Sequence, residues 1–128
     1  MILKIDMSND IPIYQQIRNQ IVFGIAKGEL KYGDSLPTVR QLAEDLGVNP
    51  MTVNKAYSIL KSEGTIIIDR RHGAKISKQE MDGIVFDAEF DQRATLLISE
   101  AAARGAEKEA LLAHIKNLVE VVYNTAKA

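Results

Sequence analysis

The stretch from residue 36 to residue 76 constrains the fold more than any other part of this chain. It contains two short amphipathic segments separated by a glycine at position 47. A β-branched run and a short returning segment follow, with a basic turn at residues 69–73 between them. Two helices joined by a tight turn and followed by a β-hairpin with a basic tip are typical of a winged helix-turn-helix.

The first amphipathic segment begins near Pro37, whose missing N–H costs nothing at a helix entry. Gly47 follows its apolar stripe at once, which favours a helix end in the left-handed conformation. Asn49 and Pro50 restart the chain as a second helix, because Asn can cap free N–H groups and Pro has its φ preset. Helical spacing predicts that this second helix buries Val53, Ala56, Tyr57 and Leu60.

The opposite face of the second helix is polar and mostly short. Asn can pair with adenine through two hydrogen bonds, Thr can touch a thymine methyl, and Lys can reach guanine or phosphate. A polar stripe is usually only a solvated helix face, but the second helix of this motif is the one that enters the major groove. We therefore predict DNA contacts from Asn49, Met51, Thr52, Asn54 and Lys55.

The predicted hairpin has strands at residues 65–68 and 74–77 and a basic tip. Arginine offers a charged fork to phosphate, and glycine lets a backbone approach DNA closely. The alternative is that Arg70 and Arg71 only keep an exposed edge soluble. We predict contacts with the phosphate backbone or the minor groove from Arg71, His72 and Gly73.

The same stretch resembles the DNA-binding domain of GntR-family bacterial transcription regulators. The residues that carry the resemblance are Leu-Pro-Thr at 36–38, Arg40, Leu-Ala at 42–43, Leu-Gly-Val at 46–48, Thr-Val at 52–53, Leu60, Glu-Gly at 63–64 and Gly73. Upstream, the IPIYQQI sequence at 11–17 resembles the YtrA-like branch of that family. The resemblance implies that Arg40 reads a guanine or clamps a phosphate, that Thr52 contacts the DNA backbone and that Gly73 approaches the minor groove. Thr38, in the same segment as Arg40, is also predicted to contact DNA. The resemblance further implies a short helical tail used for dimerisation.

The net charge of −1 is unevenly distributed. Residues 1–78 carry +3, from eleven Lys/Arg and eight Asp/Glu, whereas residues 79–128 carry −4. The local field steers a protein toward phosphate, so the first part is the one suited to DNA. Because +3 is only mildly basic, we expect dimerisation to be needed for useful affinity.

The chain before residue 36 is expected to support the motif. Residues 2–5 alternate like a short strand, and Asn9 or Asp10 can cap the helix that follows. That helix repeats isoleucine at positions 13, 17, 21 and 25, which indicates core packing rather than a ligand site.

The tail is predicted to form two amphipathic helices separated by Gly105, after a polar linker at residues 78–83. Their apolar stripes are too wide for two helices to bury against each other, so a second subunit is the economical partner. The alternative is that they fold back onto their own chain. The predicted dimer interface includes Phe90, Leu97, Leu111, Ile115, Leu118 and Val122.

The predicted fold class is mostly α with a small β-wing. Residues 1–78 would form a winged helix-turn-helix domain, and residues 79–128 a linker and a two-helix dimerisation and effector region. A chain with no cysteine, no signal-like start and no apolar run near ~18 residues suits the cytoplasm. No catalytic arrangement is visible, so we expect no enzyme, cofactor or metal, and His114 is interpreted as a surface or interface residue.

The predicted function is that of a homodimeric, sequence-specific DNA-binding repressor. It is expected to bind an inverted repeat of double-stranded DNA at its own promoter, and the family resemblance suggests a transporter operon. A small-molecule effector is left open, and no membrane partner is expected. The alternative is a winged helix that binds protein or RNA without reading a DNA sequence. The polar recognition face and Arg40 argue against that, because protein-binding surfaces tend to expose apolar groups.

Overall fold

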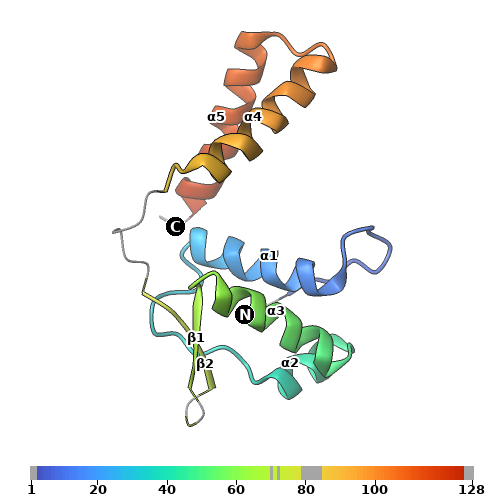
Figure 1. Ribbon diagram of the computed structural model, residues 1–128, viewed down its shortest axis with the longest axis vertical. Helices are drawn as coiled ribbons and strands as arrows, with labels where there is room; N and C mark the ends of the chain where they lie inside the picture. The colour runs from blue at the N-terminus through green and yellow to red at the C-terminus, as the bar shows by residue number, and fades with distance from the viewer. Residues whose placement is uncertain (1–2, 70, 72, 79–84, 126–128) are drawn as a thin grey trace. The chain divides into compact units, whose positions relative to one another are not determined.

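The computed structural model describes residues 3–69, 71, 73–78 and 85–125, and these contain helices and one β-hairpin (Figure 1). The elements in chain order are α1 (Ile13–Ala26), α2 (Val39–Leu46), α3 (Pro50–Ser62), β1 (Ile66–Asp69), β2 (Gly73–Ile76), α4 (Ala88–Ala103) and α5 (Lys108–Thr125). The predicted fold class, a winged helix-turn-helix followed by two helices, is confirmed. The described residues form two compact units, one up to residue 78 and one from residue 85 to residue 125.

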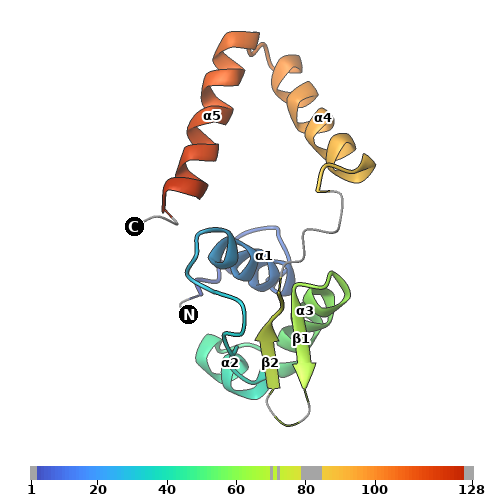
Figure 2. The ribbon, with the colours of Figure 1, turned by 90° about the vertical axis from the view of Figure 1, so that its left-hand side faces the viewer.

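The first unit is built around α3. Helices α1 and α2 both pack against α3, and β1 contacts it as well (Figures 1 and 2). The isoleucine repeat of α1 buries Ile17 and Ile21 completely, as its spacing predicts. Each such side chain contributes roughly 1.5–3 kcal/mol on burial, so this core can support a folded unit. The other buried hydrophobic residues are Leu30, Leu36, Leu42, Ala43, Val53, Ala56, Tyr57, Leu60, Ile66, Ala74 and Ile76.

The turn between α2 and α3 has the geometry that its sequence predicts. Gly47 lies at φ +68°, in the left-handed region that favours glycine. The side-chain oxygen of Asn49 accepts a hydrogen bond from the N–H of Met51 at 2.8 Å, and Pro50 is the first helical residue of α3. The turn at Gly47, the cap at Asn49 and the start of α3 at Pro50 therefore all match the predicted helix-turn-helix.

The start of α2 differs from the prediction. Pro37 lies before the helix, and Thr38 is the cap, because its hydroxyl oxygen accepts a hydrogen bond from the N–H of Gln41 at 3.0 Å. A threonine can satisfy one of the free N–H groups of the first turn, which a proline cannot do. The helix therefore begins at Val39.

Strand β2 of the wing is hydrogen-bonded along both of its edges. β1 pairs antiparallel with β2. On the other edge of β2, the N–H of Leu36 donates to the carbonyl oxygen of Ala74 at 2.8 Å, and Ser35 forms an isolated bridge with Lys75. This pairing with the loop before α2 was not predicted. It ties the position of the wing to the start of α2.

The segment before α1 was wrongly predicted as a strand. Residues 3–5 form none, and their backbone bonds to side-chain amides instead. The N–H of Lys4 donates to Oε1 of Gln20 at 2.8 Å, and the N–H of Asp6 donates to Oε1 of Gln16 at 2.9 Å. Gln16 is buried and donates in turn to two backbone carbonyl oxygens. Two glutamines of α1 thus replace a partner strand.

The predicted caps of α1 are also wrong. The helix begins at Ile13 after Pro12, three and four residues beyond Asp10 and Asn9, and no side chain caps it. The side-chain oxygen of Asn9 accepts instead from the N–H of Ile11 at 2.9 Å, which stabilises a turn before the helix.

The second unit consists of α4 and α5. Asp87 caps α4 by accepting a hydrogen bond from the N–H of Phe90 at 2.8 Å, and Gly105 at φ +97° lies in the turn between the two helices. None of the described side chains of this unit is buried, and those that reach half-burial are Ala94, Ala101, Leu111, Ile115 and Val122. Across the described ranges, no helix is long and apolar enough to cross a membrane.

Candidate nucleic-acid interface

Helix α3 has one buried face and one open face, as its spacing predicts. Val53, Ala56 and Leu60 have no exposed surface, and Tyr57 is almost fully buried. The residues predicted to contact DNA lie on the other side, where Asn49, Met51, Asn54 and Lys55 are exposed and Thr52 is half-buried. Burial of the first face fixes which side chains α3 can offer to a ligand.

The two predicted asparagines differ in what they can still bind. The oxygen of Asn49 is used to cap α3, so the side chain has mainly its amide protons to offer. The amide of Asn54 has no hydrogen-bond partner among the residues that the structure describes. Pairing with an adenine edge requires both the oxygen and the nitrogen of the amide. Asn54 is therefore the better equipped of the two to read a base.

Lys55 is positioned by α1. Its Nζ lies 4.0 Å from the centre of the Tyr14 ring, a cation–π contact. This contact orients the side chain toward α1, on the flank of α3 away from the wing. Lys55 is exposed there, which suits an interaction with a phosphate at the edge of the interface better than one with a base.

A small cleft brings three predicted residues together from three elements. Thr38 at the start of α2, Asn54 on α3 and Gly73 on β2 all line it, and its volume is about 180 Å³. The other lining residues are Pro37, Val39, Tyr57, Ile68 and Ala74. Residues far apart in the sequence thus meet at one surface between the helix-turn-helix and the wing.

Tyr57 holds this cleft together, and the sequence analysis treated it only as a core residue. Its hydroxyl donates a hydrogen bond to the carbonyl oxygen of Pro37 at 2.7 Å. Burial raises the pKa of Tyr57 well above its ordinary value, so the hydroxyl stays protonated and remains a donor. This bond fixes the start of α2, and with it Thr38 and Arg40, relative to α3.

Arg40 is exposed on the first turn of α2 and takes part in no hydrogen bond or ion pair among the described residues. The hydroxyl oxygen of Thr38 accepts the capping bond, which leaves its proton free to donate outward. A guanidinium and a hydroxyl at a helix start are both suited to a phosphate oxygen or a base edge.

The tip of the wing is described only in part. Gly73 pairs with Asp69 and has φ +73°. A Cβ at this position would meet no atom of the chain within 4 Å, so the backbone conformation rather than crowding requires glycine here. Arg71 is exposed, and its N–H donates to Oδ1 of Asp69 at 2.8 Å. The predicted contact His72, like Arg70, lies outside the described residues.

The wing also exposes two apolar side chains that the sequence analysis missed. Ile67 is 53% exposed and Ile68 47% exposed, although both belong to β1. Ile68 lines the cleft beside Asn54. The β-branched run predicts a strand, but nothing in its pattern marks which members face outward, where they can meet a thymine methyl or a sugar.

Nothing in the described ranges suggests a metal centre, since no three His, Asp or Glu side chains lie close enough there to hold an ion. The surface around the cleft offers hydrogen-bonding groups and charge together with the apolar side chain of Ile68.

Comparison with known proteins agrees with this arrangement. The model of the family described as "Bacterial regulatory proteins, gntR family" matches residues 13–76, from the start of α1 to the end of β2. The HTH-type transcriptional repressor YtrA of Bacillus subtilis (strain 168) is 37% identical over 118 residues, which cover 91% of this chain and 91% of that protein.

Two solved structures are similar over most of the chain. A crystal structure of a transcriptional antiterminator from Listeria monocytogenes EGD-e has a TM-score of 0.84 at 27% identity, covering 96% of this chain and 93% of that one. YtrA from Sulfolobus acidocaldarius, a GntR-family transcription factor, has a TM-score of 0.65 at 41% identity, covering 80% of this chain and 99% of that one.

Proposed function

This chain belongs to the GntR family of bacterial regulatory proteins, and we propose that it acts as a homodimeric repressor that binds an inverted-repeat operator. Family membership makes it a DNA-binding transcription regulator and not an enzyme. Of the two functions that the sequence leaves open, this favours DNA binding over a module that binds protein or RNA. The observation that carries the proposal is the cleft that joins Thr38, Asn54 and Gly73 beside the open face of α3.

Each predicted residue has a role in this proposal. Asn54 reads a base through its unpaired amide, and Arg40 reads a guanine or clamps a phosphate. Thr38 and Lys55 contact phosphates on opposite flanks of α3. Gly73 brings the backbone of the wing near the minor groove. The remaining contacts are Asn49, Met51 and Thr52 on α3, and Arg71 and His72 on the wing.

The second unit supplies the dimer. Within it, Phe90 is 47% exposed, Leu97 68% and Leu118 52%, although all three belong to the apolar stripes of α4 and α5. Surface of this kind is normally covered in a soluble protein. A second copy would cover it and present two recognition helices to half-sites related by a two-fold axis. The proposed interface also includes Leu111, Ile115 and Val122.

The space between α4 and α5 of one copy is too small for an ordinary effector. The cavity between α4 and α5 has a volume of about 220 Å³, and its lining is apolar apart from His114. Ordinary small-molecule sites begin near ~300 Å³. We therefore place a regulatory ligand at the dimer interface. The regulated genes are proposed to include its own operon, with a transporter among them.

Fluorescence anisotropy with the DNA upstream of its own gene tests the proposal. A scrambled duplex of equal length and composition is the control, and both are titrated at several salt concentrations. We expect the upstream DNA to bind at least ~10³-fold more tightly than the scrambled duplex, with affinity falling steeply as salt increases. Equal affinity for the two duplexes at every salt concentration would contradict an operator at that position.

A further inference from the structure

We propose that α4 pairs with α4 of a second copy of this chain in antiparallel orientation, in a register that its own charges select. The inference rests on the proposed homodimer. It adds which helix meets which, in which direction and at which residues.

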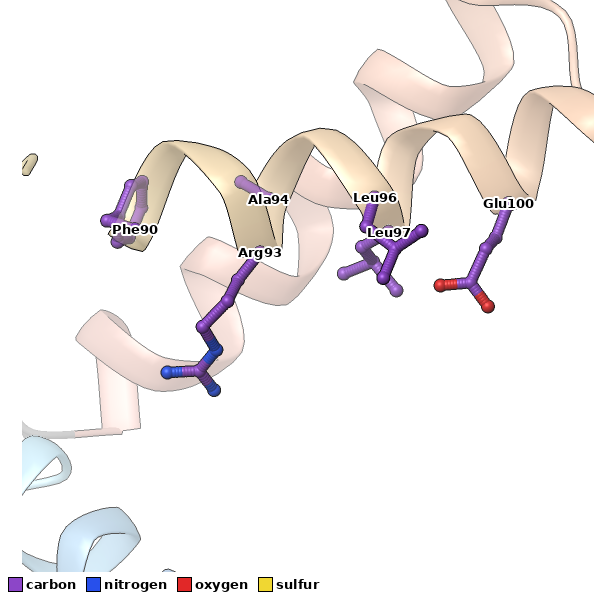
Figure 3. A pocket seen from close by; sticks show the side chains of 6 residues that line it. All are labelled: Phe90, Arg93, Ala94, Leu96, Leu97 and Glu100. Carbon is purple, nitrogen blue, oxygen red and sulfur yellow. The ribbon is translucent and has the colours of Figure 1, made fainter. Parts of the chain in front are cut away.

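One side of α4 combines exposed leucines with opposite charges. Leu96 is 62% exposed and Leu97 is 68% exposed. With Arg93 and Glu100 on either side, they line an open hollow of about 580 Å³, together with Phe90 and Ala94. Figure 3 shows that Arg93, Leu96, Leu97 and Glu100 project from the same side of the helix.

The charges along this side follow a regular order. Residues seven apart lie nearly in line on an α-helix, and residues four apart share a face. Arg93 and Glu100 are seven apart, Glu89 precedes Arg93 by four, and Arg104 follows Glu100 by four. The face therefore runs negative, positive, apolar, negative, positive, with the two leucines at its centre.

This order is self-complementary when two helices run in opposite directions. A two-fold axis through the midpoint between Leu96 and Leu97 places Arg93 opposite Glu100 of the partner subunit. The same axis places Glu89 opposite Arg104 of the partner subunit. Symmetry makes each contact occur twice. A parallel pair in the same register would instead bring like charges together, which is destabilising.

The two inner charges are available for this pairing. Neither Arg93 nor Glu100 forms a side-chain ion pair or hydrogen bond within the described part of the chain. Helix α5 contacts the neighbouring side of α4, where Ala94 and Ala101 are half-buried and Leu97 reaches the cavity between the two helices, but Leu97 stays 68% exposed. The pairing face is thus left open by the fold of the single copy. An unrelated protein or a small ligand would not require charges that are antisymmetric about the leucines.

Sedimentation velocity on the full chain tests the register by charge reversal. Glu100→Arg should weaken the dimer roughly 10- to 100-fold, because two attractive contacts become repulsive. Glu109→Arg, the same substitution in the first turn of α5, is the matched control and should change the dimer constant less than ~3-fold. The double variant Arg93→Glu/Glu100→Arg should return to within roughly 5-fold of the wild type, because positions 93 and 100 again carry opposite charges across the two-fold axis.

The outcomes separate this inference from the proposed function. The register would be overturned if the double variant dimerised as weakly as Glu100→Arg, or if Glu100→Arg dimerised as strongly as the control. In either case, a wild type that dimerises would still support the homodimer. A wild type that is monomeric at all concentrations would overturn both the register and the homodimer. Operator binding, recorded on the same samples, reports separately on the DNA-binding assignment.

Cysteine cross-linking gives a second readout that does not depend on the charges. The chain has no cysteine, so Arg93→Cys and Glu100→Cys each introduce a single thiol. Mixed under oxidising conditions, the two variants should form a disulfide-linked dimer. Either variant alone should not, because like positions are ~10 Å apart along the axis at 1.5 Å per residue. Cross-linking of one variant alone as efficient as in the mixture, or no disulfide-linked dimer in the mixture, would overturn the proposal.

Discussion

The two units of this molecule use their apolar residues in opposite ways. In the first unit, Ile17, Val53 and Leu60 have no exposed surface, whereas in the second Leu96 and Leu97 are each more than 60% exposed. The first unit carries a complete core within one copy of the chain. The second has amphipathic helices without a core. The contrast teaches that the first unit has its core within one copy of the chain, whereas the proposed homodimer is what would cover the exposed apolar stripes of the second.

The net charge also differs between the two parts of the chain. The basic excess lies in residues 1–78 and the acidic excess in residues 79–128. A positive first part is attracted to phosphate, and a negative second part is repelled from it. In the proposed homodimer, the acidic second part would therefore join the two copies rather than contact DNA.

The largest expected effect is on the core of the first unit. Leu60→Ala should lower the free energy of unfolding by roughly 2–5 kcal/mol, because it leaves a cavity among fully buried side chains. Urea denaturation measures the change. Leu96→Ala is the matched control in the second unit. At protein concentrations too low for dimerisation, its free energy of unfolding should stay within ~0.5 kcal/mol of the wild-type value. Equal losses in both variants would break the comparison between the units.

The next effect concerns base recognition. Asn54→Ala should weaken operator binding by roughly 1–3 kcal/mol and leave the affinity for scrambled DNA unchanged, because a base contact carries specificity. Anisotropy on both duplexes measures this. Asn117→Ala makes the same change at an exposed position of α5 and should leave both affinities as they are. A uniform loss on both duplexes for Asn54→Ala would assign the residue to the phosphate backbone instead.

The hydroxyl of Tyr57 has a smaller effect on stability. Tyr57→Phe should cost about 0.5–1.5 kcal/mol, since it leaves the carbonyl oxygen of Pro37 without its donor. Burial raises the pKa of Tyr57, so its neutral form contributes fully below the ordinary value of 10.0 and the contribution is lost as the pH rises further. Unfolding curves of both proteins between pH 8 and ~11 measure this. A wild type and variant that lose stability in parallel there would contradict the role of the hydroxyl.

The smallest effect is expected at the wing. Arg71→Ala should reduce the slope of log affinity against log salt by about one, on operator and scrambled DNA alike, if its charge neutralises one phosphate. Titrations at four or more salt concentrations give the slope. Lys116→Ala removes an exposed charge from α5 and should leave the slope unchanged. An unaltered slope for Arg71→Ala would remove this residue from the interface.

The parts of the fold that sequence predicts well are those with local causes. Gly47 ends α2 and Asn49 caps α3 because each acts on backbone within a few residues. The buried face of α3 follows from helical spacing alone. The amphipathic stripes of α4 and α5 are local patterns as well, but such a pattern does not determine what covers them.

Several features that the local patterns did not predict depend on contacts between distant residues. The alternation of residues 3–5 was real, but side chains of Gln16 and Gln20 satisfy that backbone where a strand was expected. The bridge between Ser35 and Lys75 and the bond between Tyr57 and Pro37 both join segments at least twenty residues apart. Such pairs follow from packing, and no local pattern marks them.

Binding of half-sites and full sites tests most directly that one unit binds DNA and the other joins two copies. The comparison uses an operator half-site and the complete inverted repeat, each titrated with the wild type and with Ile115→Asp. The wild type should bind the full repeat at least ~100-fold more tightly than the half-site, because the second contact becomes intramolecular. Ile115→Asp should keep the wild-type affinity for the half-site and gain nothing from the full repeat. The account would be contradicted if Ile115→Asp still bound the full repeat as much more tightly than the half-site as the wild type does. It would also be contradicted if Ile115→Asp lost binding to the half-site.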